Sequence, residues 1–141
     1  MFSIIAAGFL TSAIAGEKDL EVGKKAPKIE TITGTNVGYD ANSENKTKVI
    51  SFWTPKKPES RINNRKLYQE YGTGEADTEF ISICTDDDKK LMEEVLKIDK
   101  ISGENNYSYD EISSRVFKDY RVEEYPRAFK ISAQGKILEI I

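Results

Sequence analysis

Two short apolar runs constrain the fold of this chain more than any other feature. The first covers residues 48–53 (KVISFW) and the second covers residues 79–84 (EFISIC). Such runs are typical of strands that are buried on both faces. The stretch between them reads as a helix, because Pro58 suits a first helical turn and Gly72 suits a helix end. Strand, helix and strand in this order predict a right-handed parallel crossover.

The other segments extend this crossover into an α/β domain. Two strands are expected before it, at residues 29–33 and 35–40. After it, the acidic residues 86–88 predict the start of one helix, and a capping box at residues 108–111 predicts another. Residues 105–109 read as a turn-rich loop, and a hairpin forms the last part of the chain. The expected order is β-β-β-α-β-α-α-β-β, a mixed sheet with helices on both faces.

The first residues have the features of an export signal. Residues 2–15 are apolar or small, they end in Ala13-Ile14-Ala15, and charged residues follow. The segment is shorter than the roughly 20 residues that span a bilayer, so no membrane span is expected after cleavage. We predict a signal peptide over residues 1–15, one domain over residues 16–141, and a periplasmic or otherwise exported protein. Because no Lys or Arg follows Met1, the alternative is a buried N-terminal helix in a cytoplasmic protein.

Composition excludes several kinds of chemistry. The chain of 141 residues has no histidine and one cysteine. The lack of histidine excludes His-based nucleophilic catalysis and nearly all catalytic zinc sites, and one cysteine cannot form an internal disulfide. The net charge of −3 is small and no basic stripe is present, so no nucleic-acid partner is expected. Asp86–Asp88 should cap a helix, because three consecutive carboxylates do not converge on a metal ion. No metal and no other cofactor is expected.

Four blocks of the sequence keep the order and spacing of a known family. They are VGKKAP (22–27), VISFWTPKKPESR (49–61), FISICTDDDKKLMEEVLK (80–97) and VFKDYRVEEYPRAFKISAQGKIL (116–138). In these blocks the chain resembles the thioredoxin-fold family, on the side of the exported bacterial thiol-disulfide oxidoreductases and the related alkyl-hydroperoxide-reductase-like domains. The resemblance implies an α/β, thioredoxin-like mixed sheet over residues 16–141.

The chain departs from this family at the positions that carry its chemistry. Counting from Trp53, the two cysteines of the family would fall at Lys57 and Ser60, so both thiols are absent. A lysine cannot attack a disulfide, and Ser60 has no histidine to act as its general base. Lys56 and Lys57 are expected either to be solvated or to bind an anionic group. The family also usually has a helix after the last hairpin, and a homodimer could cover the face that this helix would occupy.

The resemblance also implies a place where a peptide could bind. In the family, the proline that matches Pro126 is cis and faces the active-site loop, and the residue before it, here Tyr125, can pair with an extended peptide. Trp53 either contacts a peptide or packs in the core. We therefore predict a redox-inactive accessory module that binds a peptide or another exported protein through Trp53, Thr54, Tyr125 and Pro126. A purely structural domain that docks to other exported proteins is a further possibility.

The single Cys84 supports the enzymatic alternative. It ends the second apolar run, and ligand sites of open α/β sheets lie beyond such strand ends. A thiol there could form a mixed disulfide or be oxidised to a sulfenic acid. However, free cysteines are usually buried, and the neighbouring aspartates would raise the thiol pKa. The two interpretations are a structural Cys84 and a thiol-disulfide oxidoreductase that acts through Cys84.

Overall fold

The computed structural model describes five stretches of the chain, residues 20–38, 45–74, 77–102, 104–123 and 127–141. Its elements are β1 (Thr47–Trp53), α2 (Pro58–Tyr71), β2 (Thr78–Cys84), α3 (Lys89–Ile98), β3 (Asn106–Tyr107), the 3₁₀ helix η1 (Tyr109–Glu111), α4 (Ser114–Asp119), β4 (Ala128–Ile131) and β5 (Ile137–Ile140). The predicted signal segment, residues 1–15, lies outside the described residues. Within the described stretches, no helix has the length and apolar character needed to cross a membrane.

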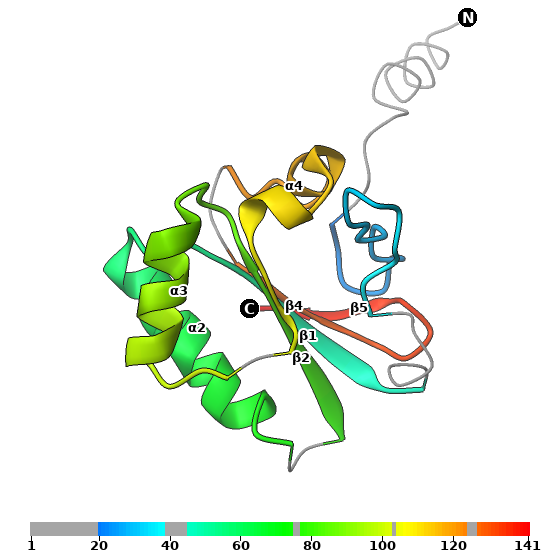
Figure 1. The fold of residues 1–141 in the computed structure, drawn as a ribbon. Coiled ribbons are helices and arrows are strands. Elements are labelled where there is room, and N and C mark those ends of the chain that lie inside the picture. Colours follow the sequence, from blue (N-terminus) through cyan, green and yellow to red (C-terminus); the bar gives the residue numbers. More distant parts are fainter. Residues whose placement is uncertain (1–19, 39–44, 75–76, 103, 124–126) are drawn as a thin grey trace, which may run out of the picture.

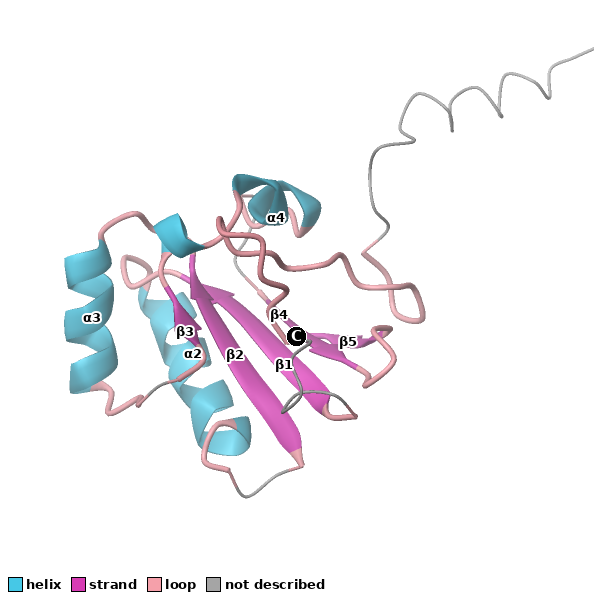
Figure 2. Cartoon of the chain, turned by 45° about the vertical axis from the view of Figure 1, so that its right-hand side comes forward, coloured by secondary structure: helices cyan, strands magenta, loops and turns pink. Residues whose placement is uncertain are grey.

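The strands form one five-stranded sheet in the order β3-β2-β1-β4-β5. β1 runs parallel to β2, which runs parallel to β3, whereas β4 is antiparallel to both β1 and β5. β1 therefore lies at the centre, and β3 forms one edge of the sheet (Figure 2). The connection from β1 through α2 to β2 is the predicted parallel crossover, and the hairpin β4–β5 is also confirmed.

Side chains of β1 alternate between two apolar cores. Ile50 and Phe52 join the core beneath α4 and the residues 20–37, where the Phe52 and Tyr120 rings lie 4.9 Å apart. Val49 and Trp53 point to the other face, which α2 and α3 cover. Figure 1 shows this arrangement, with α2 and α3 on one side of the sheet and α4 on the other. The predicted α/β fold, a mixed sheet with helices on both faces, is confirmed.

Two expectations about the strands are wrong. Residues 29–33 and the described part of residues 35–40 form no strand, only isolated bridges such as Glu30 with Asn36 and Thr31 with Ile112. This segment pairs one residue at a time with different neighbours, so no ladder develops. Conversely, residues 105–109 were expected to be a loop, but β3 forms there and pairs with β2.

The predicted third helix is divided into two pieces. The predicted capping box is present, and in it Glu111 Oε1 accepts a hydrogen bond of 2.9 Å from the Ser108 backbone N–H. It caps η1, and α4 begins separately at Ser114. The residues expected to face inward, Ile112, Val116 and Tyr120, are all buried.

A charged contact joins α2 to the end of α3. Arg61 donates two hydrogen bonds to Asp99, of 2.9 Å from Nε and 2.7 Å from Nη2. The Asp99 side chain is only 3% exposed, and Arg65 lies 3.8 Å from the same carboxylate. The hydrogen bonds from Arg61 lower the pKa of Asp99. This contact fixes the first turn of α2, where the site described below is found.

The substitution Asp99→Asn should lower the free energy of unfolding by about 2 kcal/mol at pH 7, between the values of exposed and buried pairs. Because the folded pKa of Asp99 is lowered, its stabilisation is complete above the usual carboxyl range near pH 4 and disappears as the pH falls through the lowered value. Urea unfolding at several pH values measures this difference.

The exposed Asp87 provides a matched control. Asp87→Asn should change the free energy of unfolding by less than about 0.5 kcal/mol. If Asp99→Asn lowered the free energy of unfolding by the same amount in acid as at pH 7, the loss of stability could not come from the ionised contact with Arg61.

Candidate functional site

The candidate site lies where β1 and β2 end side by side. Trp53 and Cys84 are partners in the parallel register. One residue further on, Thr85 donates from its backbone N–H to the Trp53 carbonyl at 2.8 Å. The chain then leaves β1 through residues 54–57 and enters α2. Carboxyl ends of neighbouring parallel strands are the usual position of ligand sites in α/β proteins.

The two positions that would carry the family's thiols flank the start of α2. Lys57 is the N-cap residue, its side chain is exposed, and it makes no side-chain capping hydrogen bond. Ser60 lies in the first turn, and its Oγ accepts a hydrogen bond of 2.9 Å from the Thr54 backbone N–H. Thr54 Oγ1 in turn accepts from the Lys56 N–H at 3.2 Å. The Ser60 hydroxyl therefore holds the loop against α2.

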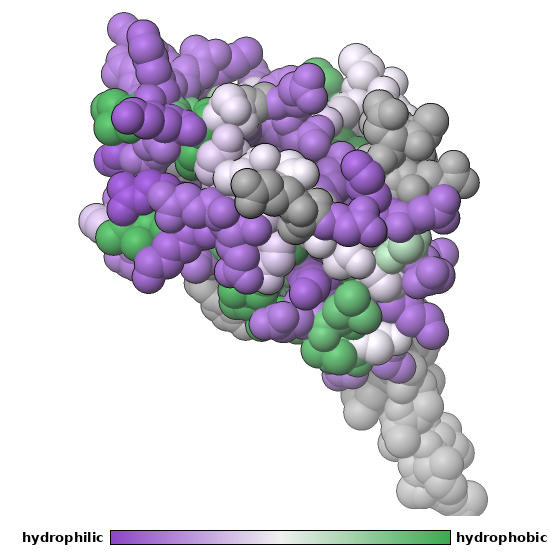
Figure 3. All heavy atoms as spheres, turned by 90° about the horizontal axis from the view of Figure 1, so that it is seen from below, coloured by the Kyte–Doolittle hydropathy of each residue, from purple (hydrophilic) through white to green (hydrophobic). Residues whose placement is uncertain are grey.

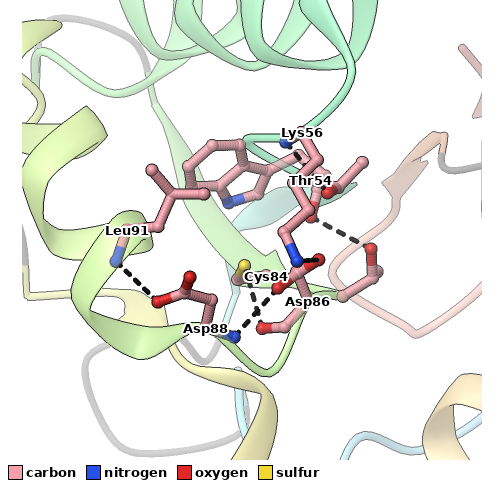
Figure 4. A network of polar contacts seen from close by, with 8 residues as sticks. Thr54, Lys56, Cys84, Asp86, Asp88 and Leu91 are labelled. Carbon is pink, nitrogen blue, oxygen red and sulfur yellow. Dashed lines mark hydrogen bonds and ion pairs between the residues drawn. The ribbon is translucent and has the colours of Figure 1, made fainter.

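An ion pair connects this loop to the acidic residues after β2. Lys56 Nζ lies 3.2 Å from Asp86 Oδ2, and the hydrogen bond to Asp86 raises the pKa of Lys56. Asp86 Oδ1 also accepts from the Asp88 N–H at 2.9 Å, and Asp88 Oδ1 accepts from the Leu91 N–H at 3.0 Å. Figure 4 shows these contacts around Cys84. The predicted acidic helix cap is confirmed, with Asp88 as the N-cap of α3.

Cys84 lies beneath this network and is fully buried. Its Sγ donates a hydrogen bond to the Asp86 carbonyl at 3.5 Å. Burial raises the pKa of the Cys84 thiol to about 11. At pH 7 only about one molecule in ten thousand would then carry the thiolate, the form that attacks disulfides. Geometry and charge together favour a structural Cys84.

Two of the four residues expected to bind a peptide are buried, and the other two lie outside the described residues. Trp53 is 2% exposed and packs in the core that contains Met92 and Leu96, so its burial favours the packing alternative. Thr54 is also buried, and its backbone N–H is bonded to Ser60. Tyr125 and Pro126 lie outside the described residues.

Sequence reasoning missed the contact between Lys56 and Asp86. A signal for it was present, because the loop after β1 carries lysines and the loop after β2 carries aspartates. Parallel neighbours bring such loops to the same edge of a sheet. The contact from Thr54 to Ser60 had no comparable signal, since a serine in a first helical turn has many possible acceptors and donors.

Several solved structures have a fold similar to that of this chain. A thioredoxin-like protein from Parabacteroides distasonis superposes with a TM-score of 0.72 and 22% identity, over 88% of this chain and 89% of that one. For a thiol-disulfide oxidoreductase from Bacteroides fragilis the TM-score is 0.61 and the identity is 23%, over 83% of this chain and 89% of that one. For a secreted disulfide oxidoreductase from Mycobacterium tuberculosis the TM-score is 0.60 and the identity is 22%, over 82% of this chain and 81% of that one. Neither the protein-family models nor the curated proteins include a match to the sequence.

The chain thus has a thioredoxin-like fold and is structurally similar to thiol-disulfide oxidoreductases. The resemblance inferred from the four sequence blocks is confirmed at the level of the fold. The chain carries one cysteine, at position 84, and none at positions 57 and 60.

We expect Cys84 to resist alkylation by iodoacetamide in the native protein near pH 7.5 and to react fully after denaturation. The reasons are its burial and its pKa of about 11. Mass spectrometry of the intact chain measures the labelled fraction over time, with the denatured protein as control. Fast, complete labelling of the folded chain would show that Cys84 is accessible as a thiolate.

Proposed function

We propose that this chain is an exported thioredoxin-fold protein that does not catalyse dithiol exchange and instead binds an extended polypeptide segment. The observation that carries this proposal is the structure of the α2 start. Lys57 and Ser60 occupy the two thiol positions of the family, and the Ser60 hydroxyl is engaged by the Thr54 N–H at 2.9 Å. Neither side chain can take or give electrons in a disulfide exchange.

The burial of Cys84 argues against the enzymatic alternative. A one-cysteine oxidoreductase needs a thiolate that its substrate can reach. Cys84 has no exposed surface, and burial raises its pKa to about 11. A structural role in the core is the simpler account of this residue.

The start of β4 supports a peptide site near Tyr125 and Pro126. The Arg127 carbonyl accepts a hydrogen bond of 3.1 Å from the Phe52 N–H, so residue 127 lies beside the end of β1. The family resemblance assigns strand addition to the backbone of Tyr125, two residues before Arg127 in the sequence.

Export and the kind of partner are parts of the same proposal. The apolar segment that ends at Ala15 supports export, and a structurally similar protein from Mycobacterium tuberculosis is described as secreted. The partner would be an extended peptide or another exported protein. A second copy of this chain is one such protein, and light scattering separates a homodimer from a monomeric peptide binder.

Tyr125→Ala should weaken binding of an unfolded polypeptide several-fold, because truncation of an aromatic contact residue removes about 1–2 kcal/mol or more of binding free energy. Reduced, carboxymethylated α-lactalbumin is a suitable probe, since it is permanently unfolded and has no free thiol. Fluorescence anisotropy of the labelled probe measures its affinity for the purified full chain.

Tyr109→Ala serves as the control, since Tyr109 is 39% exposed and packs on Phe117 of α4. It should leave the affinity unchanged. Equal losses from both variants, or no detectable binding by the natural chain, would contradict a peptide site at Tyr125.

Restoring the two thiols should restore dithiol chemistry. In a Cys84→Ala background, Lys57→Cys with Ser60→Cys should form an intramolecular disulfide in a glutathione buffer, because residues three apart in a first helical turn lie roughly 5–6 Å from each other. Mass spectrometry after acid quenching and alkylation measures the oxidised fraction.

The control with Lys57→Cys alone should form only a mixed disulfide with glutathione. If the double variant also stopped at mixed disulfides, α2 would not present these positions as thioredoxin-like enzymes do, and the idea of a disarmed site would be wrong.

A further inference from the structure

A second candidate site lies at the opposite end of the sheet. A cleft of about 970 Å³ opens there between the last turn of α2, the beginning of β2 and the segment that leads into β3. Figure 3 looks at the molecule from this end, and the surface seen there is mostly hydrophilic. Trp53 and Cys84 are the last residues of β1 and β2, and neither of them lines the cleft. The cleft is therefore separate from the candidate site above.

Aromatic rings from α2 and β2 form part of the lining. Tyr68 and Tyr71 come from the end of α2, and Phe80 comes from β2. The Tyr68 and Phe80 rings meet edge to face, with centroids 6.1 Å apart. The Tyr71 ring already holds the Lys130 ammonium, which is not part of the lining, 5.7 Å from its centroid. Ring faces of this kind attract organic cations.

The polar part of the lining has an excess of acceptor oxygens. Glu79 Oε2 accepts a hydrogen bond of 3.0 Å from Asn105 Nδ2. Glu79 Oε1 and Asn106 Oδ1 are buried, yet within the described stretches neither accepts a hydrogen bond. Leaving a buried acceptor without a donor costs about 1–3 kcal/mol, more for a charged group. A ligand with N–H donors would remove this cost once either side chain turned its oxygen toward the cleft.

The net charge of the lining is negative, as a cationic ligand requires. Among the described lining residues, those of charged type are Glu79, Glu104 and Lys46, which give a formal charge of −1. A negative lining, two unused acceptor oxygens and aromatic rings together select a cation that carries N–H groups. A neutral ligand would leave the negative charge of the lining unmatched, and an anion would be repelled by it.

We propose that this cleft binds an organic ammonium or guanidinium group, with Glu79 as its main anionic contact and Asn106 as a second acceptor. The group could belong to a free polyamine or to a basic side chain of a polypeptide. This inference does not rest on the proposed peptide site, because none of the described cleft residues belongs to that site.

The test is an NMR titration of the full chain with spermidine and, separately, with agmatine. Backbone amide shifts should concentrate at Glu79 and Asn106 and should shrink as salt is added. Glu79→Gln should weaken binding about tenfold, since it removes the charge and places a donor where an acceptor is needed. Asn106→Asp should strengthen binding, because it adds an anion beside the same group.

A matched control is Glu93→Gln on the exposed face of α3, which should leave the affinity unchanged. Two further probes separate the sources of the cation, a short acetylated peptide with one arginine and the same peptide with citrulline. Binding of the arginine peptide alone points to a protein ligand, and tighter binding of spermidine points to a free polyamine.

Several outcomes would overturn the proposal. They are the absence of shifts at millimolar spermidine, equal affinities for the arginine and citrulline peptides, and an affinity that Glu79→Gln leaves unchanged while the variant remains folded. Shifts confined to Thr54 and Lys57 would place any cation at the other end of the sheet and would equally reject the cleft.

Discussion

The burial of β1 on both faces is the constraint on which the rest of the structure depends. Every residue of this strand from Lys48 to Trp53 is buried. β1 also pairs along both edges, with β2 in parallel and with β4 antiparallel. Neither its register nor its side-chain alternation can change without moving apolar side chains to the wrong face. Trp53 is therefore fixed in the core, and the site loop must begin at Thr54.

Polar contacts then fix the end of the sheet in a closed arrangement. Ser60 binds the Thr54 N–H, Lys56 pairs with Asp86, and the Asp86 carbonyl accepts from the Cys84 thiol. A dithiol enzyme needs the opposite arrangement, with a thiolate exposed at a helix N-terminus where the helix dipole lowers its pKa. The same thioredoxin-like scaffold is thus present here, with the polar groups at this end of the sheet used in structural contacts.

Regular, buried elements could be predicted from the sequence, and irregular ones could not. The runs at residues 48–53 and 79–84 carry a strong apolar signal, and β1 and β2 form there. β3 has only two residues, Asn106 and Tyr107, and its pairing with β2 is a long-range event that leaves no periodic pattern. The alternation at residues 29–33 was misleading, because isolated bridges satisfy that backbone one residue at a time.

The candidate site was predictable in position but not in detail. Counting from Trp53 located Lys57 and Ser60 at the start of α2, and the acidic cap after β2 was also expected. The contact of Ser60 with Thr54 depends on how the loop after β1 folds onto the first turn of α2, which no local pattern encodes. The contact of Lys56 with Asp86 joins two loops, and only the parallel order of β1 and β2 indicates it. The cleft near Glu79 was not predictable either, because its described lining residues come from four separate segments.

The most direct test of the central claim is the reduction of insulin disulfides by the natural chain with dithiothreitol as the electron donor. Our account predicts that the protein adds nothing to the rate with dithiothreitol alone, because no reactive thiol stands at the end of β1. Catalytic acceleration that disappears in the Cys84→Ala variant would contradict it.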